Sequence, residues 1–231
     1  MTGKALIVGA GSGISAAFAR LLAKDGCAVT LAARSTDKLA ALAKETGAQV
    51  LACDAGSPES VAALFAGVDR APGALDLVLY NASYRTRGPL VELDPAEVEK
   101  TLRISAFGGF LVAQAAAKRM VAQGQGALFF TGASASVKGY AQSAPFAMGK
   151  FALRGLAQSV ARELSPKGLH VAHFVIDGGV ANAGRGRPAP ADKPDSLLDP
   201  DAIAQTYLAV FRQPRSAWSL EVELRPWVER F

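Results

Sequence analysis

A glycine-rich turn near the amino end has the residue types of a phosphate-binding site. The apolar run Ala5–Val8 leads directly into Gly9-Ala10-Gly11-Ser12-Gly13-Ile14-Ser15, and apolar residues then recur at helical spacing. Glycine lets the backbone turn sharply and approach a pyrophosphate, whose charge the amides at a helix amino terminus can bind. This strand–turn–helix context predicts a dinucleotide site at Gly9, Ser12, Gly13 and Ile14; the alternative is a tight turn without a ligand.

The second apolar run indicates which dinucleotide binds. Residues 28–32 suit a buried strand, and Arg34 follows them. In a dinucleotide-binding fold the residue near the end of this strand contacts the adenosine ribose. An acidic side chain there favours a free 2′-hydroxyl, and an arginine favours a 2′-phosphate. No acid occupies positions 31–33, so Arg34 predicts NADP(H) in preference to NAD(H), unless its side chain is simply solvated.

A lysine follows a phenylalanine at helical spacing in the stretch Phe146-Ala147-Met148-Gly149-Lys150. Positions four apart lie on one face of a helix, about a turn from each other. By itself the pair predicts a core phenylalanine beneath a solvated lysine. A chemical role for Lys150 therefore depends on the elements around it.

Strand-like and helix-like segments alternate along the chain. Apolar segments predict strands at 5–8, 28–32, 50–53, 75–80, 128–131, 169–176 and 218–224. Helical patterns lie between them, at 36–46, from 58, and at 94–123, 142–165 and 199–212. The pairs Ser57-Pro58, Asp94-Pro95 and Asp199-Pro200 are typical of an N-cap and a first-turn proline. The alternation predicts an α/β Rossmann fold, a doubly wound parallel sheet of about seven strands with helices on both faces, in one domain spanning residues 1–231.

The composition excludes several classes of partner. Of the 231 residues, half are apolar and 19% are charged, and the net charge of +5 is spread along the chain, which predicts no nucleic-acid binding. Cys27 and Cys53 have no metal-ligand or redox spacing, so we expect buried thiols in a reducing compartment and no metal site. The first strand leaves no room for a signal peptide, and no apolar run is long enough to span a membrane. These features predict a cytoplasmic protein.

With these motifs in order, the chain resembles the short-chain dehydrogenase/reductase family over essentially its whole length. The family's Gly-x-x-x-Gly-x-Gly turn matches Gly9 and Gly13, and Ser15 stands where the third glycine is usual. Its Asn-Asn-Ala-Gly motif after the fourth strand is similar to Tyr80-Asn81-Ala82-Ser83, which implies cofactor contacts by Asn81 and Ala82.

The resemblance also implies cofactor contacts after the third and sixth strands. The family's acidic residue that contacts adenine corresponds to Asp54, with Ala55 beside it. Its Pro-Gly motif is matched imperfectly by Asp177-Gly178, which places Val180 and Asn182 where the nicotinamide-facing residues fall.

The family's catalytic residues are matched at two of four positions. Ser134, after the fifth strand, corresponds to the serine that holds the substrate oxygen, and Lys150 to the lysine of the Tyr-x-x-x-Lys motif. Phe146 falls on the tyrosine, and Ser105 on the helper asparagine. Hydride transfer to a carbonyl leaves an alkoxide that needs a proton, and phenylalanine has none to give. The resemblance still implies that Lys150 binds the nicotinamide ribose.

Three interpretations of this change stay open. Another group supplies the proton, with Tyr84, Tyr140 or a water held by Lys150 as candidates. Alternatively, the protein binds NADP(H) without turnover, as a sensor or partner subunit. In the third, Ser134 and Ser105 serve other chemistry, with Arg85 or Arg87 on an anionic substrate. We favour an NADP(H)-dependent reductase acting on a small carbonyl or alcohol.

The substrate side and the assembly are predicted less directly. Residues 181–200 are rich in proline, glycine and charge, and a loop of this length is typical of a mobile lid on the substrate side. The family's usual assemblies imply a homo-oligomer, a dimer or a tetramer.

Overall fold

Seven parallel strands form one sheet in the order β3-β2-β1-β4-β5-β6-β7. The computed structural model describes residues 3–193 and 195–229. Its strands are β1 Lys4–Val8, β2 Ala28–Ala33, β3 Gln49–Ala52, β4 Leu75–Tyr80, β5 Gly126–Thr131, β6 Leu169–Ile176 and β7 Glu221–Leu224. The predicted strands at 75–80 and 169–176 are confirmed at both ends, and the doubly wound parallel sheet is confirmed as a whole.

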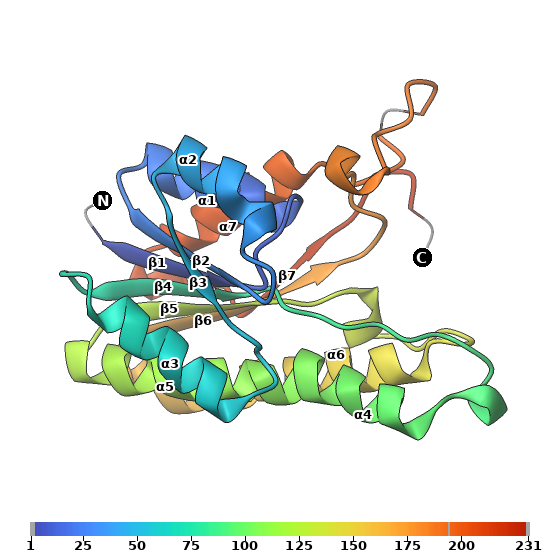
Figure 1. Ribbon diagram of the computed structural model, residues 1–231, viewed down its shortest axis with the longest axis horizontal. Helices are drawn as coiled ribbons and strands as arrows, with labels where there is room; N and C mark the ends of the chain where they lie inside the picture. The colour runs from blue at the N-terminus through green and yellow to red at the C-terminus, as the bar shows by residue number, and fades with distance from the viewer. Residues whose placement is uncertain (1–2, 194, 230–231) are drawn as a thin grey trace.

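Helices cover both faces of this sheet (Figure 1). One face carries α1 Ile14–Lys24, α2 Ala40–Thr46 and α7 Pro200–Phe211. The other carries α3 Pro58–Asp69, α4 Pro95–Leu102, α5 Gly108–Gln123 and α6 Ala144–Leu164. Each face encloses its own apolar core, one around Phe18, Phe129 and Tyr207, and one around Phe65 and Phe130. The two cores hold the sheet rigid between them.

Three helices begin where the sequence predicts. Ser57, Asp94 and Asp199 each accept a hydrogen bond from a backbone amide two or three residues later, at 3.0–3.1 Å. A proline occupies the first turn of α3, α4 and α7. Local capping chemistry therefore decides these helix starts.

Other boundaries differ from the prediction because tertiary contacts override the local pattern. The helix expected from 94 to 123 contains a π-helical turn, Arg103–Phe107, between α4 and α5. The helix expected from 142 begins at Ala144, and Gln142 has a φ of 59°. The seventh strand begins at Glu221 and not at 218, because Trp218 instead stacks on His170 with ring centroids 4.8 Å apart.

The sheet reverses its winding between β1 and β4. The chain leaves β1 for β2 on the face of α1, and it reaches β5 from β4 on the face of α5. Ligands of open α/β sheets bind at the carboxyl edge next to such a reversal. Gly9 and Asn81 follow the two strands at this point.

Candidate active site

Gly9 is required by the contact between the first and fourth strands. Its φ is +85°, and a Cβ there would lie 2.3 Å from the backbone nitrogen of Ala82. The Gly9 amide donates to the carbonyl of Ala32 at 2.9 Å, and the Asn81 amide donates to the carbonyl of Val8 at 2.8 Å. The backbone of the motif after β4 therefore occupies the space that a side chain at position 9 would need.

Ser15 and Asn81 stabilise the glycine turn through hydrogen bonds. The Asn81 Nδ2 donates to Ser15 Oγ at 2.8 Å and, more weakly, to the Gly9 carbonyl at 3.4 Å. Ser15 Oγ also lies 3.3 Å from that carbonyl, and the serine is 1% exposed. The serine at the third-glycine position thus links α1, the turn and β4, a role that its isolated position in the sequence does not reveal.

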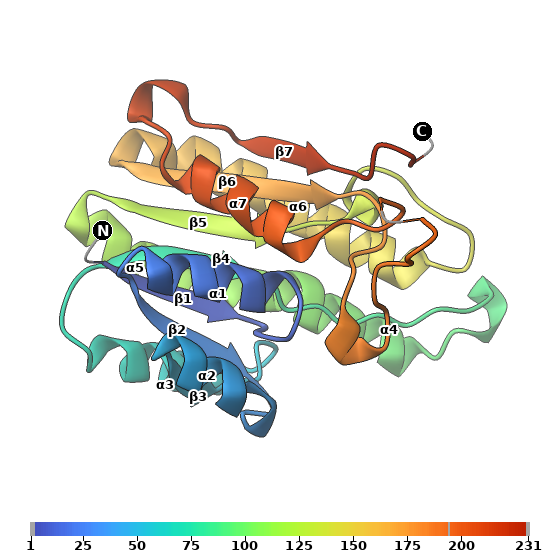
Figure 2. The same cartoon turned by 90° about the horizontal axis from the view of Figure 1, so that it is seen from above.

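The segment after β6 lies over the same turn. Ser12 Oγ donates to Asn182 Oδ1 at 3.0 Å, and a Cβ at Gly13 would lie 3.0 Å from Asn182 Nδ2. The Arg185 guanidinium comes within 3.5 Å of the Cβ position of Gly11. Figure 2 shows this orange segment beyond the carboxyl end of β6. Asn182 and Arg185 therefore face the glycine turn directly.

The base of this segment is held by backbone pairing. Val180 forms a bridge with Leu198, whose amide donates to the carbonyl of Gly179 at 2.8 Å. Gly178 has a φ of +142°, and a Cβ there would lie 2.8 Å from Pro226. The two ends of the predicted 181–200 loop are thus brought together at the carboxyl edge of the sheet.

The glycine turn fits a dinucleotide pyrophosphate. Helix α1 begins after Gly13 without a side-chain cap, so Ile14 and Ser15 present the first backbone amides of the helix to the turn. Arg34, just beyond β2, is exposed and has no hydrogen bond or ion pair within the described part of the chain. Its free guanidinium suits a phosphate next to the adenosine ribose.

Asp54 and Ala55 form the turn after β3. Asp54 Oδ1 accepts a hydrogen bond from the Gly56 amide at 3.0 Å, and the Asp54 amide donates to Ser60 Oγ at 2.9 Å. The carboxylate is exposed, whereas Ala55 is buried. Asp54 therefore stabilises its own turn, and its carboxylate stays at the surface.

Lys150 and Phe146 lie together on α6, as their spacing predicts, but the lysine is not solvated. Lys150 is 3% exposed, and its Nζ donates to the carbonyl of Thr131 at the end of β5, at 2.8 Å. Burial lowers the pKa of Lys150 to about 8. Its Nζ lies 5.8 Å from the centroid of the Phe146 ring, and the Arg85 guanidinium lies 4.7 Å from the same centroid.

Ser105 lies in the π-helical turn and fixes the chain after β4. Its Oγ donates to the Tyr84 carbonyl at 3.2 Å and lies 3.3 Å from the Tyr84 amide, which donates to it. The hydroxyl is fully buried. A Cβ at Gly149 would lie 2.9 Å from the Ser105 Cβ, so the glycine before Lys150 is what lets α6 approach this turn.

The two candidate tyrosines have different surroundings. The Tyr84 hydroxyl donates to Glu97 and accepts from Lys100 at 3.3 Å, which directs it toward α4. The Tyr84 hydrogen bond, followed by that of Lys100, lowers the pKa of Glu97. Tyr140 is 45% exposed, and Lys138 Nζ lies 5.8 Å from its ring centroid.

Ser134 opens the short turn between β5 and α6. Its carbonyl accepts the amides of Val137 and Lys138, both at 3.0 Å, and the residue is partly exposed. Lys138 in turn forms a 3.5 Å ion pair with Asp177, which is 3% exposed at the end of β6. Ser134, Lys138 and Asp177 therefore lie beside the carboxyl ends of β5 and β6.

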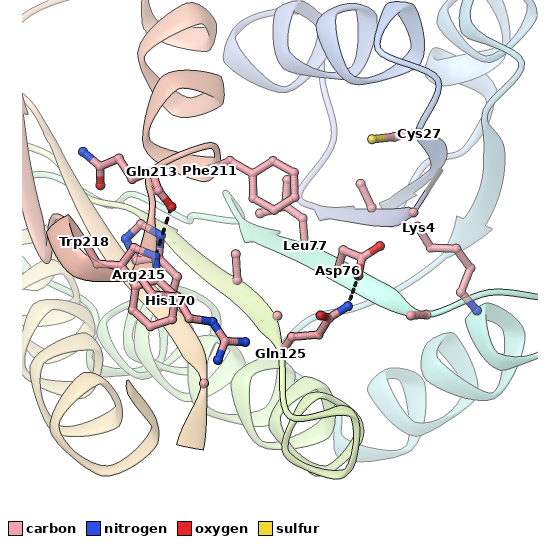
Figure 3. A pocket seen from close by; sticks show the side chains of 16 residues that line it. Lys4, Cys27, Asp76, Leu77, Gln125, His170, Phe211, Gln213, Arg215 and Trp218 are labelled. Atoms are coloured by element: carbon pink, nitrogen blue, oxygen red, sulfur yellow. Dashed lines mark hydrogen bonds between the residues drawn. The ribbon is translucent and has the colours of Figure 1, made fainter. Parts of the chain in front are cut away.

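A cavity of about 520 Å³ lies at the opposite edge of the sheet (Figure 3). Lys4, Asp76 and His170 line it from the starts of β1, β4 and β6, and Trp218 closes one side. This is the amino edge of the parallel strands, away from every predicted site residue. Within the described residues no group of three or more His, Cys, Asp or Glu side chains is arranged to hold a metal ion. In the same part of the chain, no helix has the length and apolar character to cross a membrane.

Known proteins have a similar sequence and fold. The model of the short chain dehydrogenase family matches residues 3–196. An uncharacterized oxidoreductase of Staphylococcus aureus (strain N315) is 28% identical over 225 residues, covering 96% of each chain. The crystal structure of a short-chain dehydrogenase from Rhodopseudomonas palustris is 33% identical with a TM-score of 0.85, covering 98% of this chain and all of the other. A metagenomic short-chain oxidoreductase in complex with NADP is 28% identical with a TM-score of 0.84, covering 99% and 98%.

Proposed function

The chain belongs to the short-chain dehydrogenase/reductase family of oxidoreductases, and from this premise we propose that it uses NADP(H) to interconvert a small carbonyl and its alcohol. The observation that carries the proposal is the glycine turn, in which Gly9 packs directly against the backbone of Ala82. The buried Lys150 lies at the same edge of the sheet. The NADP complex of the metagenomic relative supports the same type of cofactor.

The preference for NADP(H) rests on Arg34. An exposed guanidinium without a partner in the described residues can bind a 2′-phosphate, and no carboxylate lies at positions 31–33 to bind a free 2′-hydroxyl. Asn81, Asn182, Val180 and Gly178 complete the proposed cofactor site.

The proposed residue roles follow from the chemistry of hydride transfer. When bound, the nicotinamide supplies or accepts the hydride. Lys150 binds the ribose hydroxyls with an ammonium that Thr131 orients, and the Ser134 hydroxyl holds the substrate oxygen. Phe146 has no proton to transfer. Of the two candidate acids we favour Tyr140, because the Tyr84 hydroxyl already donates to Glu97.

Binding without turnover is the second candidate function. Phe146 favours it, since loss of a general acid typically lowers a rate by about 10²–10⁴. A nucleotide sensor or partner subunit would keep the glycine turn and Lys150 without needing the proton.

We also propose a homo-oligomer in a reducing cytoplasm. Apolar side chains are exposed next to one another at the start of α5, where the Phe107 and Phe110 rings stack with centroids 6.1 Å apart, and Phe151 is 45% exposed on α6. A second copy of the chain would cover these rings. The free thiols of Cys27 and Cys53 are consistent with a reducing compartment.

A fluorescence titration with NADPH and NADH tests the cofactor proposal. We expect NADPH to bind more tightly by about 1.5–3 kcal/mol, the range of a charged hydrogen bond, and Arg34→Ala to abolish this difference. The control is Arg70→Ala, which removes another exposed arginine, at the end of α3. Equal affinities in the unmodified chain, unchanged in Arg34→Ala, would contradict the preference.

A further inference from the structure

Arg85 is held over the face of Phe146 by the architecture of the site. Its guanidinium carbon lies 4.7 Å from the ring centroid. The preceding residue, Tyr84, is fixed through both its amide and its carbonyl by the buried hydroxyl of Ser105. The backbone that carries Arg85 is therefore anchored, and the ring supports the side chain by a cation–π contact.

The guanidinium keeps its hydrogen-bonding edge. A guanidinium carries five N–H donors, and a cation–π contact is electrostatic and does not require a hydrogen bond from them. Within the described residues Arg85 makes no hydrogen bond and no ion pair. A forked set of donors is thus left for a ligand.

Positive charge gathers here, and no carboxylate of the described residues pairs with Arg85 or Lys150. Lys150 Nζ lies 5.8 Å from the centroid of the same ring and donates its hydrogen bond to the Thr131 carbonyl. Arg85 is exposed as a residue, but partial burial of its guanidinium, and to a smaller extent the charge of Arg87, lower its pKa. The carboxylates of Glu97 and Asp177 pair with other cations, Glu97 with Lys100 and Asp177 with Lys138 and Arg225.

We propose that Arg85, supported by Phe146, binds an anionic group of the substrate, a carboxylate or a phosphate. The inference rests on the proposed oxidoreductase function, because it places this anion beside Lys150 at the catalytic position. It also gives Phe146 a role. The family's tyrosine at this position donates a proton, whereas the Phe146 ring supports the guanidinium of Arg85. The alternative is that Arg85 is a solvated loop residue that no ligand contacts.

Binding of three matched probes tests the proposal without requiring turnover. We would measure 4-fluorobenzoate, 4-fluorophenyl phosphate and 4-fluorobenzyl alcohol by ¹⁹F NMR titration, with the protein alone and with saturating NADP⁺. Calorimetry of NADP⁺ on each variant reports the cofactor site separately. We expect at least one anion to bind about tenfold or more tightly than the alcohol, and the tighter anion identifies carboxylate or phosphate.

Three variants decide the role of Arg85. Arg85→Gln is expected to weaken the anion about tenfold or more and leave both the alcohol and NADP⁺ unchanged. Phe146→Leu should weaken the anion severalfold, because the ring that supports the guanidinium is lost. Arg162→Gln, an exposed arginine late in α6, removes the same net charge and should change nothing.

Two results would overturn the inference. One is equal affinity for the alcohol and both anions in the unmodified chain, and the other is undiminished anion binding in Arg85→Gln. A chain that fails to bind NADP⁺ would refute the proposed cofactor use instead, and the titrations on the protein alone would still decide whether Arg85 binds the anion.

Discussion

The nucleotide side and the reacting side of the site depart from their family to different extents. On the nucleotide side, Gly9, Ser15 and Asn81 form one hydrogen-bonded unit. Ser15, which stands where the family motif has its third glycine, is part of that unit. On the reacting side, Phe146 and Ser105 stand where the resemblance implies a catalytic tyrosine and a helper asparagine, so two of the four expected groups differ. Phosphate binding uses backbone amides that many sequences can present, whereas proton transfer needs one particular atom. We therefore expect nucleotide binding to persist in this chain even if its proton donor has changed.

The largest effect should come from placing a hydroxyl at position 146, on the reacting side. Phe146→Tyr is expected to raise carbonyl reduction by about 10²–10⁴-fold, because the new hydroxyl lies one helical turn from Lys150. NADPH oxidation across a panel of small aldehydes and ketones measures it. The control, Phe151→Tyr, makes the same change at an exposed position of α6. No gain with the cofactor still bound would favour the function without turnover.

The second-largest effect should come from adding a side chain at Gly9, which would lower the free energy of unfolding. Gly9→Ala combines a positive φ with a Cβ 2.3 Å from Ala82 N, and we expect a loss of about 3 kcal/mol or more in the free energy of unfolding. Gly47→Ala is the matched control, since Gly47 has a φ of +68° but no atom within 4 Å of the Cβ position. We expect it to cost about 1 kcal/mol. Equal losses in urea unfolding would mean that the contact with Ala82 is unimportant.

The free energy of unfolding should also fall in acid, because of the buried His173 on β6. Burial lowers the pKa of His173 to about 4 from an ordinary 6.5, against the opposing effect of Glu221 on β7, and Lys150 and Arg154 of α6 lower it further. The unfolded chain binds this proton below about pH 6.5 and the folded chain only near pH 4, so stability falls as the pH drops between these values. The loss is up to about 3 kcal/mol.

Urea unfolding of His173→Asn between pH 7 and pH 4 checks this dependence. Asparagine can still donate to Glu221 but does not titrate, so the variant should lose less stability on acidification than the unmodified chain. The same slope in both proteins would show that other groups cause the acid sensitivity.

The smallest expected effect concerns Ser15. Ser15→Ala removes the buried acceptor of the Asn81 amide and should lower the free energy of unfolding by about 1–2 kcal/mol. Ser12→Ala, in the same turn but exposed, should cost less than about 0.5 kcal/mol. Similar losses in the two variants would refute the role of Ser15 in fastening the turn.

The sequence by itself determined the features that depend on neighbours along the chain. Ser57, Asp94 and Asp199 cap helices because the groups they bind lie two or three residues away. The apolar runs at 75–80 and 169–176 predict strands because burial on both faces of a sheet requires them. The order of strands and helices then identifies the fold and its carboxyl edge.

Only the tertiary structure decided which side chains meet across that edge. Ser15 and Asn81 are 66 residues apart, and Ser12 and Asn182 are 170 apart. The contact of Arg85 with Phe146 depends on Ser105 holding the chain after β4, and the approach of Gly149 to Ser105 depends on how α6 packs. The physical reason is that the sheet brings strand ends together regardless of their separation in the chain, so local patterns contain no record of these pairings.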